Sequence, residues 1–152
     1  MKLISLLEKL EYTCLQGSTD QEVKNVIYDS RKVEEGSLFI CIRGAVVDGH
    51  KFVPDVVAKG AKVLIVEEAV EAPEDVTVIL VKDTRYAMAF ISAAYFGYPA
   101  EKLKTIGITG TKGKTTTTYM VKSILENAGY KVGLIGTIEA IIGDKAVSYT
   151  QS

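Results

Sequence analysis

The sequence predicts an α/β protein in two parts, a small α/β domain over residues 1–98 and a strand–loop–helix–strand unit over residues 99–152. In the first part, short runs of Val, Ile and Leu alternate with segments whose apolar residues recur at helical spacing, which is typical of α/β domains. In the second part, a glycine-rich turn separates a β-rich run from a helical segment. Gly97 and Pro99 mark the boundary, because both residue types interrupt helices.

The first part contains four predicted strands and three predicted helical segments. Brief β-rich runs bounded by Gly, Asp or Pro predict strands at Val26–Tyr28, Leu38–Ile42, Val63–Val66 and Val76–Val81. Helical spacing of apolar residues begins at Leu3 and recurs in Phe52–Lys59 and Asp83–Phe96. Asp83 is a typical N-cap residue, and Gly60 is a typical residue after a helix C-terminus.

The second part begins with a predicted strand and continues through a turn and a helix to further strands. The order is Leu103–Thr109 as a strand, Gly110–Gly113 as a turn, Lys114–Ala128 as a helix and Lys131–Thr137 as a second strand. Two later runs, Ile138–Ile142 and Ala146–Tyr149, flank Gly143-Asp144, a dipeptide suited to a hairpin turn.

Composition restricts the classes of function. The 152 residues include 18 Lys and Arg, 19 Asp and Glu and one His, a net charge of −1, which argues against binding nucleic acid by long-range attraction. No apolar stretch approaches the roughly 20 residues that span a bilayer, so we expect no membrane partner. Cys14 and Cys41 form no metal-binding pattern with the single histidine, and the sequence favours a reduced, cytoplasmic protein.

The segment Gly107–Thr116 carries the chemistry. Gly110 and Gly113 permit a turn whose backbone N–H groups point at phosphate oxygens, next to the positive end of a helix dipole. Lys114 would reach the outer phosphates and the Thr115 hydroxyl would bind Mg²⁺. The usual pattern G-x-x-x-x-G-K-[ST] is not met, because position 108 is Ile. The alternative is an ordinary strand-to-helix turn with a solvated lysine.

Four sequence runs resemble the Mur ligase family. Residues 107–119, GITGTKGKTTTTY, are similar to the ATP loop of these enzymes, typically T-G-T-N-G-K-T-T. Residues 28–39, YDSRKVEEGSLF, resemble the D-S-R-x-V-x-x-G-x-L-F signature of the family's N-terminal, UDP-binding domain. Residues 48–52 match its D-G-H-x-F step, and residues 83–85 resemble the linker into the ATP domain. The resemblance extends over essentially the whole chain.

The resemblance implies a UDP-binding domain followed by the beginning of a P-loop ATPase domain. It implies an ATP-dependent ligase of peptidoglycan synthesis that adds a third amino acid, L-lysine or meso-diaminopimelate, to UDP-N-acetylmuramoyl-L-Ala-D-Glu through an acyl phosphate. The alternatives are the family's ligase of the next step, a P-loop kinase or simple NTPase, and a non-catalytic UDP-sugar-binding module.

The resemblance also assigns site residues. Those implied for ATP are Gly110, Thr111, Lys112, Gly113, Lys114, Thr115 and Thr116, with Thr115 on Mg²⁺ and Lys112 standing where Asn is usual. Those implied for the UDP-N-acetylmuramoyl-dipeptide are Tyr28, Ser30, Ala45, Val46 and Val47.

No catalytic residue is assigned, because the family's modified lysine, further metal ligands and amino-acid pocket would lie beyond Ser152. We therefore expect a ligase fragment that is inactive alone. The incomplete ATP domain would expose apolar side chains meant for missing strands, which predicts self-association through residues such as Val121, Ile124 and Leu134.

Several polar residues have plainer interpretations. His50, the only histidine, is predicted to have a capping or surface role rather than a catalytic one. Asp29 either pairs with Arg31 and caps the local backbone or touches the ligand, and the sequence leaves both open. The acidic residues from Glu67 to Asp75 are predicted to form a solvated loop and not a metal site.

Overall fold

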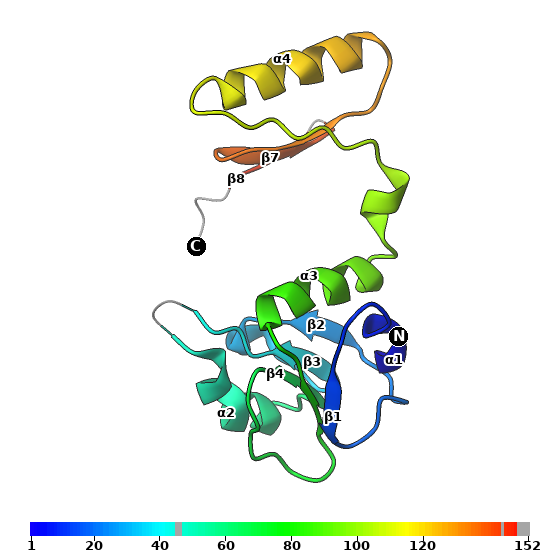
Figure 1. The fold of residues 1–152 in the computed structure, drawn as a ribbon, viewed down its shortest axis with the longest axis vertical. Coiled ribbons are helices and arrows are strands. Elements are labelled where there is room, and N and C mark those ends of the chain that lie inside the picture. The colour runs from blue at the N-terminus through cyan, green and yellow to red at the C-terminus, as the bar shows by residue number, and fades with distance from the viewer. Residues whose placement is uncertain (45–46, 144, 149–152) are drawn as a thin grey trace. The chain divides into compact units, whose positions relative to one another are not determined.

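The structure is a computed structural model that describes residues 1–44, 47–143 and 145–148. The chain divides into two compact units, Met1–Leu103 and Lys104–Ser152, which are described separately below (Figure 1). None of the helices in the described ranges has the length and apolar character needed to cross a bilayer.

The first unit is built on a five-stranded sheet in the order β1-β5-β4-β3-β2. Its strands are β1 (Thr13–Gln16), β2 (Asn25–Ile27), β3 (Ser37–Ile40), β4 (Val63–Val66) and β5 (Thr77–Leu80). Strands β2 to β5 are parallel to their neighbours, and β1 pairs antiparallel with β5 at the edge. The four predicted strands are confirmed to within about two residues at each end. Strand β1 was not predicted, because its largely exposed residues show no apolar alternation.

Helices cover both faces of this sheet (Figure 1). Helices α1 (Leu3–Leu6) and α3 (Thr84–Tyr95) share one apolar cluster with Leu38 and Ile40 of β3. Helix α2 (Val53–Ala58) shares the other cluster with Phe39 and Cys41. Successive side chains of a strand point to opposite faces, so a strand buried on both faces is a continuous apolar run. The resulting three-layer α/β arrangement confirms the predicted fold class.

The helix boundaries follow local signals. Asp83 caps α3, because its Oδ1 accepts hydrogen bonds from the backbone N–H groups of Arg85 (2.8 Å) and Tyr86 (2.9 Å). Gly60 follows α2 with a φ of 98°, a left-handed conformation that favours glycine. The helix predicted at Phe52–Lys59 begins one residue later, at Val53, because Phe52 is the last residue of a 3₁₀ turn, η2 (Gly49–Phe52).

The second unit contains one long helix and a small antiparallel sheet. Its elements are α4 (Lys114–Asn127), β6 (Gly133–Ile135), β7 (Glu139–Ile142) and β8 (Lys145–Ser148), with the strands in that order in the sheet. The predicted helix, the strand after it and the hairpin are confirmed. In the predicted hairpin turn, Gly143 has a φ of 59° and Asp144 lies outside the described residues.

The predicted strand Leu103–Thr109 is wrong. After the 3₁₀ turn η3 (Pro99–Lys102), this run is irregular, and Leu103 and Ile106 are 65% and 63% exposed. A β-rich run forms a strand only when a neighbouring strand pairs with it, and none of the strands in the described part of the chain does so.

The predicted exposure of apolar side chains in the second unit is partly correct. No residue of α4 is buried, and Ile124 is 66% exposed, whereas Val121 is half-buried. Leu134 of β6 is buried at 7% exposure, which contradicts the expectation for that residue. Self-association through this unit stays a prediction.

Candidate functional site

The residues predicted to bind UDP follow two neighbouring parallel strands. Tyr28 comes directly after β2 and is 66% exposed, and Ser30 begins the 3₁₀ turn η1 (Ser30–Lys32). Val47, half exposed, follows β3. Because β2 and β3 are parallel and paired, both segments leave the same carboxyl edge of the sheet, where ligands of open α/β sheets bind. Ala45 and Val46 lie outside the described residues.

The turn that carries Ser30 is held by its neighbours. Asp29 Oδ1 accepts hydrogen bonds from the backbone N–H (3.0 Å) and Nε (2.9 Å) of Arg31, and the Arg31 side chain holds the pKa of Asp29 at about 2. Lys59 Nζ donates to the Ser30 carbonyl at 3.0 Å and pairs with Asp55 at 2.7 Å. Asp29 therefore caps the turn and pairs with Arg31, one of the two interpretations that the sequence left open.

Two backbone hydrogen bonds join described residues in and beside the segment 43–48, which is called the 43–48 loop below and in which 45 and 46 are not described. Gly44 N–H donates to the Val47 carbonyl at 2.9 Å, and Gly49 N–H donates to the Ile42 carbonyl at 2.8 Å. A Cβ on Gly49 would lie 2.7 Å from the backbone nitrogen of Ile42, so this close approach requires glycine.

His50 is buried, so its predicted surface position is wrong. Only 5% of its side chain is exposed, and both ring nitrogens have partners. Nδ1 lies 2.6 Å from Asp48 Oδ1, and Nε2 accepts the backbone N–H of Glu67 at 2.9 Å. An acceptor Nε2 places the ring proton on Nδ1, which donates to Asp48. The ring joins Asp48, at the end of the 43–48 loop, to Glu67, directly after β4, which is a structural role.

Arg43 and Glu67 extend the hydrogen-bond network around His50, and neither residue carried a recognisable sequence signal. Arg43 Nε donates to Asp48 at 3.2 Å, and its NH2 group donates to Glu68 at 2.9 Å. Glu67 Oε1 accepts hydrogen bonds from the backbone N–H (2.8 Å) and hydroxyl (2.7 Å) of Thr84 at the start of α3. Glu67, 18% exposed in its side chain, is thus a partly buried link and not part of a solvated loop, whereas Glu68 is exposed.

The predicted phosphate loop precedes α4 in the second unit. Gly113 is the N-cap of α4 with a φ of 76°, and Gly110 has a φ of 154°. No side chain of the described residues caps the first amides of α4. Lys114 Nζ folds back onto the Gly110 carbonyl at 2.7 Å. Uncapped amides, the helix dipole and the exposed ammonium of Lys114 together form a suitable environment for an anion such as phosphate.

The residues at this loop also suit Mg²⁺. In the described ranges, no three His, Cys, Asp or Glu side chains gather as a metal site. Mg²⁺ prefers oxygen ligands, and beside a nucleotide it needs few from the protein, because phosphates and waters supply the rest. Thr115, the second residue of α4, offers a hydroxyl next to Lys114.

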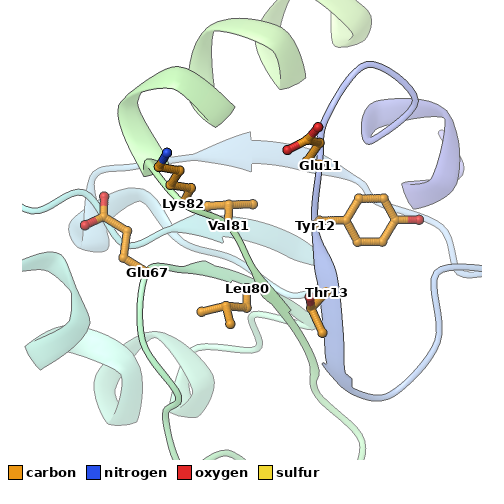
Figure 2. Close-up of a pocket in the computed structure, with 7 residues that line it drawn as sticks. All are labelled: Glu11, Tyr12, Thr13, Glu67, Leu80, Val81 and Lys82. Carbon is orange, nitrogen blue, oxygen red and sulfur yellow. The ribbon is translucent and has the colours of Figure 1, made fainter.

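The described residues of the first unit include the walls of two open clefts that stand out. The larger, about 510 Å³, is lined by Glu67 and Lys82 on one side and by Glu11, Tyr12 and Thr13 on the other (Figure 2). The smaller, about 360 Å³, includes Asp48, His50 and Glu68 in its lining. Neither cleft is lined by a residue predicted to bind UDP, with Ala45 and Val46 not described.

Acid should weaken the first unit through Asp48. The backbone N–H and the ring of His50, with Arg43 nearby, hold the pKa of Asp48 at about 2, below its ordinary 3.8. A lowered folded-state pKa stabilises the fold above the unfolded-state pKa, and this contribution is lost as the pH falls from about 4 to 2. We expect Asp48→Asn to flatten the pH dependence of the free energy of unfolding across that window, measured by urea denaturation. Asp55→Asn, at an exposed ion pair, serves as the control. An unchanged slope in Asp48→Asn would contradict the prediction.

The sequence matches two models of one protein family. Residues 22–96 match the model described as "Mur ligase family, catalytic domain", and residues 108–152 match the model described as "Mur ligase middle domain". The two matches fall in the first and second units respectively.

A curated relative and two solved structures are similar to the chain. The chain is 54% identical over 147 residues to the UDP-N-acetylmuramoyl-L-alanyl-D-glutamate–2,6-diaminopimelate ligase of Clostridium perfringens (strain 13 / Type A). The aligned region covers 97% of this chain and 30% of that protein. The chain therefore spans about 30% of the length of this relative.

The similar structures are ligases too. MurF from Acinetobacter baumannii matches with a TM-score of 0.65 at 35% identity, covering 83% of this chain and 27% of that one. A structure of a UDP-N-acetylmuramoyl-L-alanyl-D-glutamate–2,6-diaminopimelate ligase matches with a TM-score of 0.72, covering 96% of this chain and 29% of that one. Its 23% identity makes this a likeness of fold alone.

Proposed function

This chain belongs to the Mur ligase family, and on that premise we propose that it provides the UDP-substrate and ATP-phosphate binding elements of a ligase that adds 2,6-diaminopimelate to UDP-N-acetylmuramoyl-L-alanyl-D-glutamate. The observation that carries the proposal is the 54% identity to a ligase of that name over 97% of the chain. The name of that relative favours diaminopimelate over L-lysine as the added amino acid.

The first unit is proposed to bind the UDP moiety at the carboxyl edge of β2 and β3. Tyr28, Ser30 and the segment Ala45–Val47 are the proposed contacts, with domain bounds of 1–98. The exposure of Tyr28 and the fixed turn at Ser30 support this assignment. Backbone groups of the 43–48 loop would supply polar contacts, because its side chains at 45–47 are apolar.

The second unit, with proposed bounds of 99–152, is proposed to bind the phosphates of ATP through Gly110–Thr116. Lys114 would leave the Gly110 carbonyl and pair with the outer phosphates, and Thr115 would bind Mg²⁺. In the ligase reaction, the γ-phosphoryl group passes to a substrate carboxylate. The acyl phosphate is then attacked by the incoming amine, which releases phosphate as the amide forms. ATP as co-substrate and a UDP-linked precursor both suit a cytoplasmic location, which we propose as well.

A second candidate is the family's MurF activity, which the 35% identity to the Acinetobacter baumannii structure favours. Two chimeras separate the candidates. This chain would replace the matching residues of the Clostridium perfringens ligase in one and of Acinetobacter baumannii MurF in the other, each tested with its own substrates.

We expect ATP-dependent product formation by the chimera of the diaminopimelate ligase and much less by the other. In both, Lys114→Met serves as the inactive control. Product formation by the MurF chimera alone would favour the second candidate. No product from either chimera, although both are folded, would contradict the proposal.

A further inference from the structure

The larger cleft of the first unit lies where β1 pairs with the carboxyl end of β5 (Figure 2). Leu80, the last residue of β5, is in register with Thr13, the first residue of β1, and both line the cleft. Glu67, which also lines it, directly follows the parallel strand β4. Ligands of open α/β sheets usually bind at the carboxyl ends of parallel strands. The cleft volume of about 510 Å³ is within the range of about 300–1,000 Å³ that is typical of ligand sites.

Glu67 contributes a carboxylate whose position is fixed. Its Oε1 accepts hydrogen bonds from the backbone N–H (2.8 Å) and the hydroxyl (2.7 Å) of Thr84. Partial burial raises the pKa of Glu67, but the hydrogen bonds from Thr84 and the charge of Arg43 outweigh this effect, so the pKa lies below its ordinary value. Glu67 is therefore ionised at neutral pH. Its Oε2, 3.8 Å from Arg43, accepts no hydrogen bond from the residues that the structure describes.

Two more charged side chains line the cleft, and neither has a partner. Lys82 and Glu11 are exposed and form no hydrogen bond or ion pair with the described part of the chain. Elsewhere in this unit, the ammonium groups of Lys24, Lys59 and Lys62 are each paired with a carboxylate. Because Lys82 and Glu11 line opposite sides of one cleft without pairing, a ligand that carries charges of both signs can pair with each of them (Figure 2).

We propose that this cleft binds a free basic amino acid of the arginine type. The ligand carboxylate pairs with Lys82, and its α-ammonium pairs with Glu11. Its planar guanidinium pairs with the fixed carboxylate of Glu67, because the two groups match in geometry. The alkyl chain lies against Leu80 and Val81, the apolar part of the lining.

The charges of the lining select this class of ligand. Glu11, Glu67 and Lys82 together carry one net negative charge, which is complementary to a ligand with two positive groups and one negative group. An acidic amino acid has the opposite balance and should bind less well. None of the described residues that line the cleft is a proposed contact of UDP or ATP, so the inference goes beyond the proposed function and does not depend on it.

Nuclear magnetic resonance titration of the ¹⁵N-labelled 152-residue chain with L-arginine tests the inference. We expect saturable shifts of the backbone amides of Tyr12, Thr13, Val81 and Lys82, all with one dissociation constant. Agmatine, which is arginine without its carboxylate, should bind about tenfold more weakly, because one charge-assisted hydrogen bond is lost. L-Citrulline, which replaces the guanidinium with an uncharged group of similar shape, should also bind about tenfold more weakly.

Two variants assign the ligand groups to their partners. Lys82→Gln should weaken L-arginine binding about tenfold and leave agmatine binding within about twofold, because agmatine has no carboxylate to lose a partner. Glu11→Gln should weaken both ligands about tenfold, since both keep the amino group. The matched controls are Lys102→Gln and Glu74→Gln, which neutralise exposed side chains outside the cleft. Each control should change the affinity for L-arginine less than about twofold.

The inference is overturned if L-arginine causes no saturable shift, or if the shifts are spread over charged residues outside the cleft. Equal weakening of L-arginine and agmatine by Lys82→Gln would also overturn it, because Lys82 would then not pair with the carboxylate. Titrations of the same sample with UDP and with Mg·ATP test the proposed function separately. Failure of those titrations leaves the result with L-arginine unaffected.

Discussion

Replacing Lys114 with methionine is expected to weaken Mg·ATP binding by about 100-fold, equivalent to about 3 kcal/mol, the upper range for hydrogen bonds to charged groups. Lys114 is the first residue of α4, and its ammonium lies over the glycine turn at Gly110. Methionine has a similar length but neither charge nor donor, so it removes the ion pair with the outer phosphates and leaves the helix intact. Calorimetric titration of the 152-residue chain with Mg·ATP measures the effect.

Lys122→Met is the matched control for this experiment. Lys122 lies on the same helix, where its ammonium pairs with Glu126 at 2.6 Å. Losing an ion pair of this (i, i+4) kind should leave ATP affinity unchanged, and it changes helix stability by only a few tenths of a kcal/mol. Equal ATP affinity in Lys114→Met and the unmodified chain would mean that Gly110–Thr116 is an ordinary turn before a helix with a solvated lysine, which corresponds to the alternative that the sequence allowed.

Replacing Ile65 with alanine is expected to destabilise the first unit by about 3 kcal/mol, because a buried Ile→Ala change removes apolar contacts and leaves a cavity. Ile65 is fully buried in β4, where it is in register with Ile40 of β3 and Ile79 of β5. All three residues belong to the apolar cluster beneath α1 and α3. Urea denaturation followed by circular dichroism gives the change in the free energy of unfolding.

The control is Ile4→Ala, the same substitution at a residue of α1 that is 50% exposed. Its cost should stay within about 0.5 kcal/mol, as for most surface substitutions. A similar loss of stability in both variants would show that β4 is not at the centre of the core.

Local patterns were sufficient for most elements of the first unit. Strands β3 and β4 are buried on both faces, so they are uninterrupted apolar runs that can be recognised without knowing their partners. Asp83 predicts the start of α3 in the same way. The side chain of an N-cap residue accepts hydrogen bonds only from backbone N–H groups two or three residues ahead, so the signal is local. Strand β1 lacked such a signal. Its residues are largely exposed, and it forms a strand because its backbone pairs with β5, which the local sequence does not show.

The same distinction explains the wrong strand prediction. Leu103–Thr109 has the composition of a strand, but composition does not supply the neighbouring strand that β structure requires. In the candidate site, Ser30 and the glycine loop were recognised through contiguous motifs, whose residues act together within a few positions of one another.

The sequence by itself therefore determined the α/β class, most of the helices and strands, the glycine loop before α4 and the motifs shared with the Mur ligases. Only the tertiary structure established the network that joins Arg43, Asp48 and His50 to Glu67 and Glu68, and the link from Glu67 on to Thr84. The physical reason is distance along the chain. Arg43 and Glu68 are separated by 25 positions, and His50 and Glu67 by 17. Parallel strands bring such residues to one edge of the sheet, and no local pattern records which of them will meet.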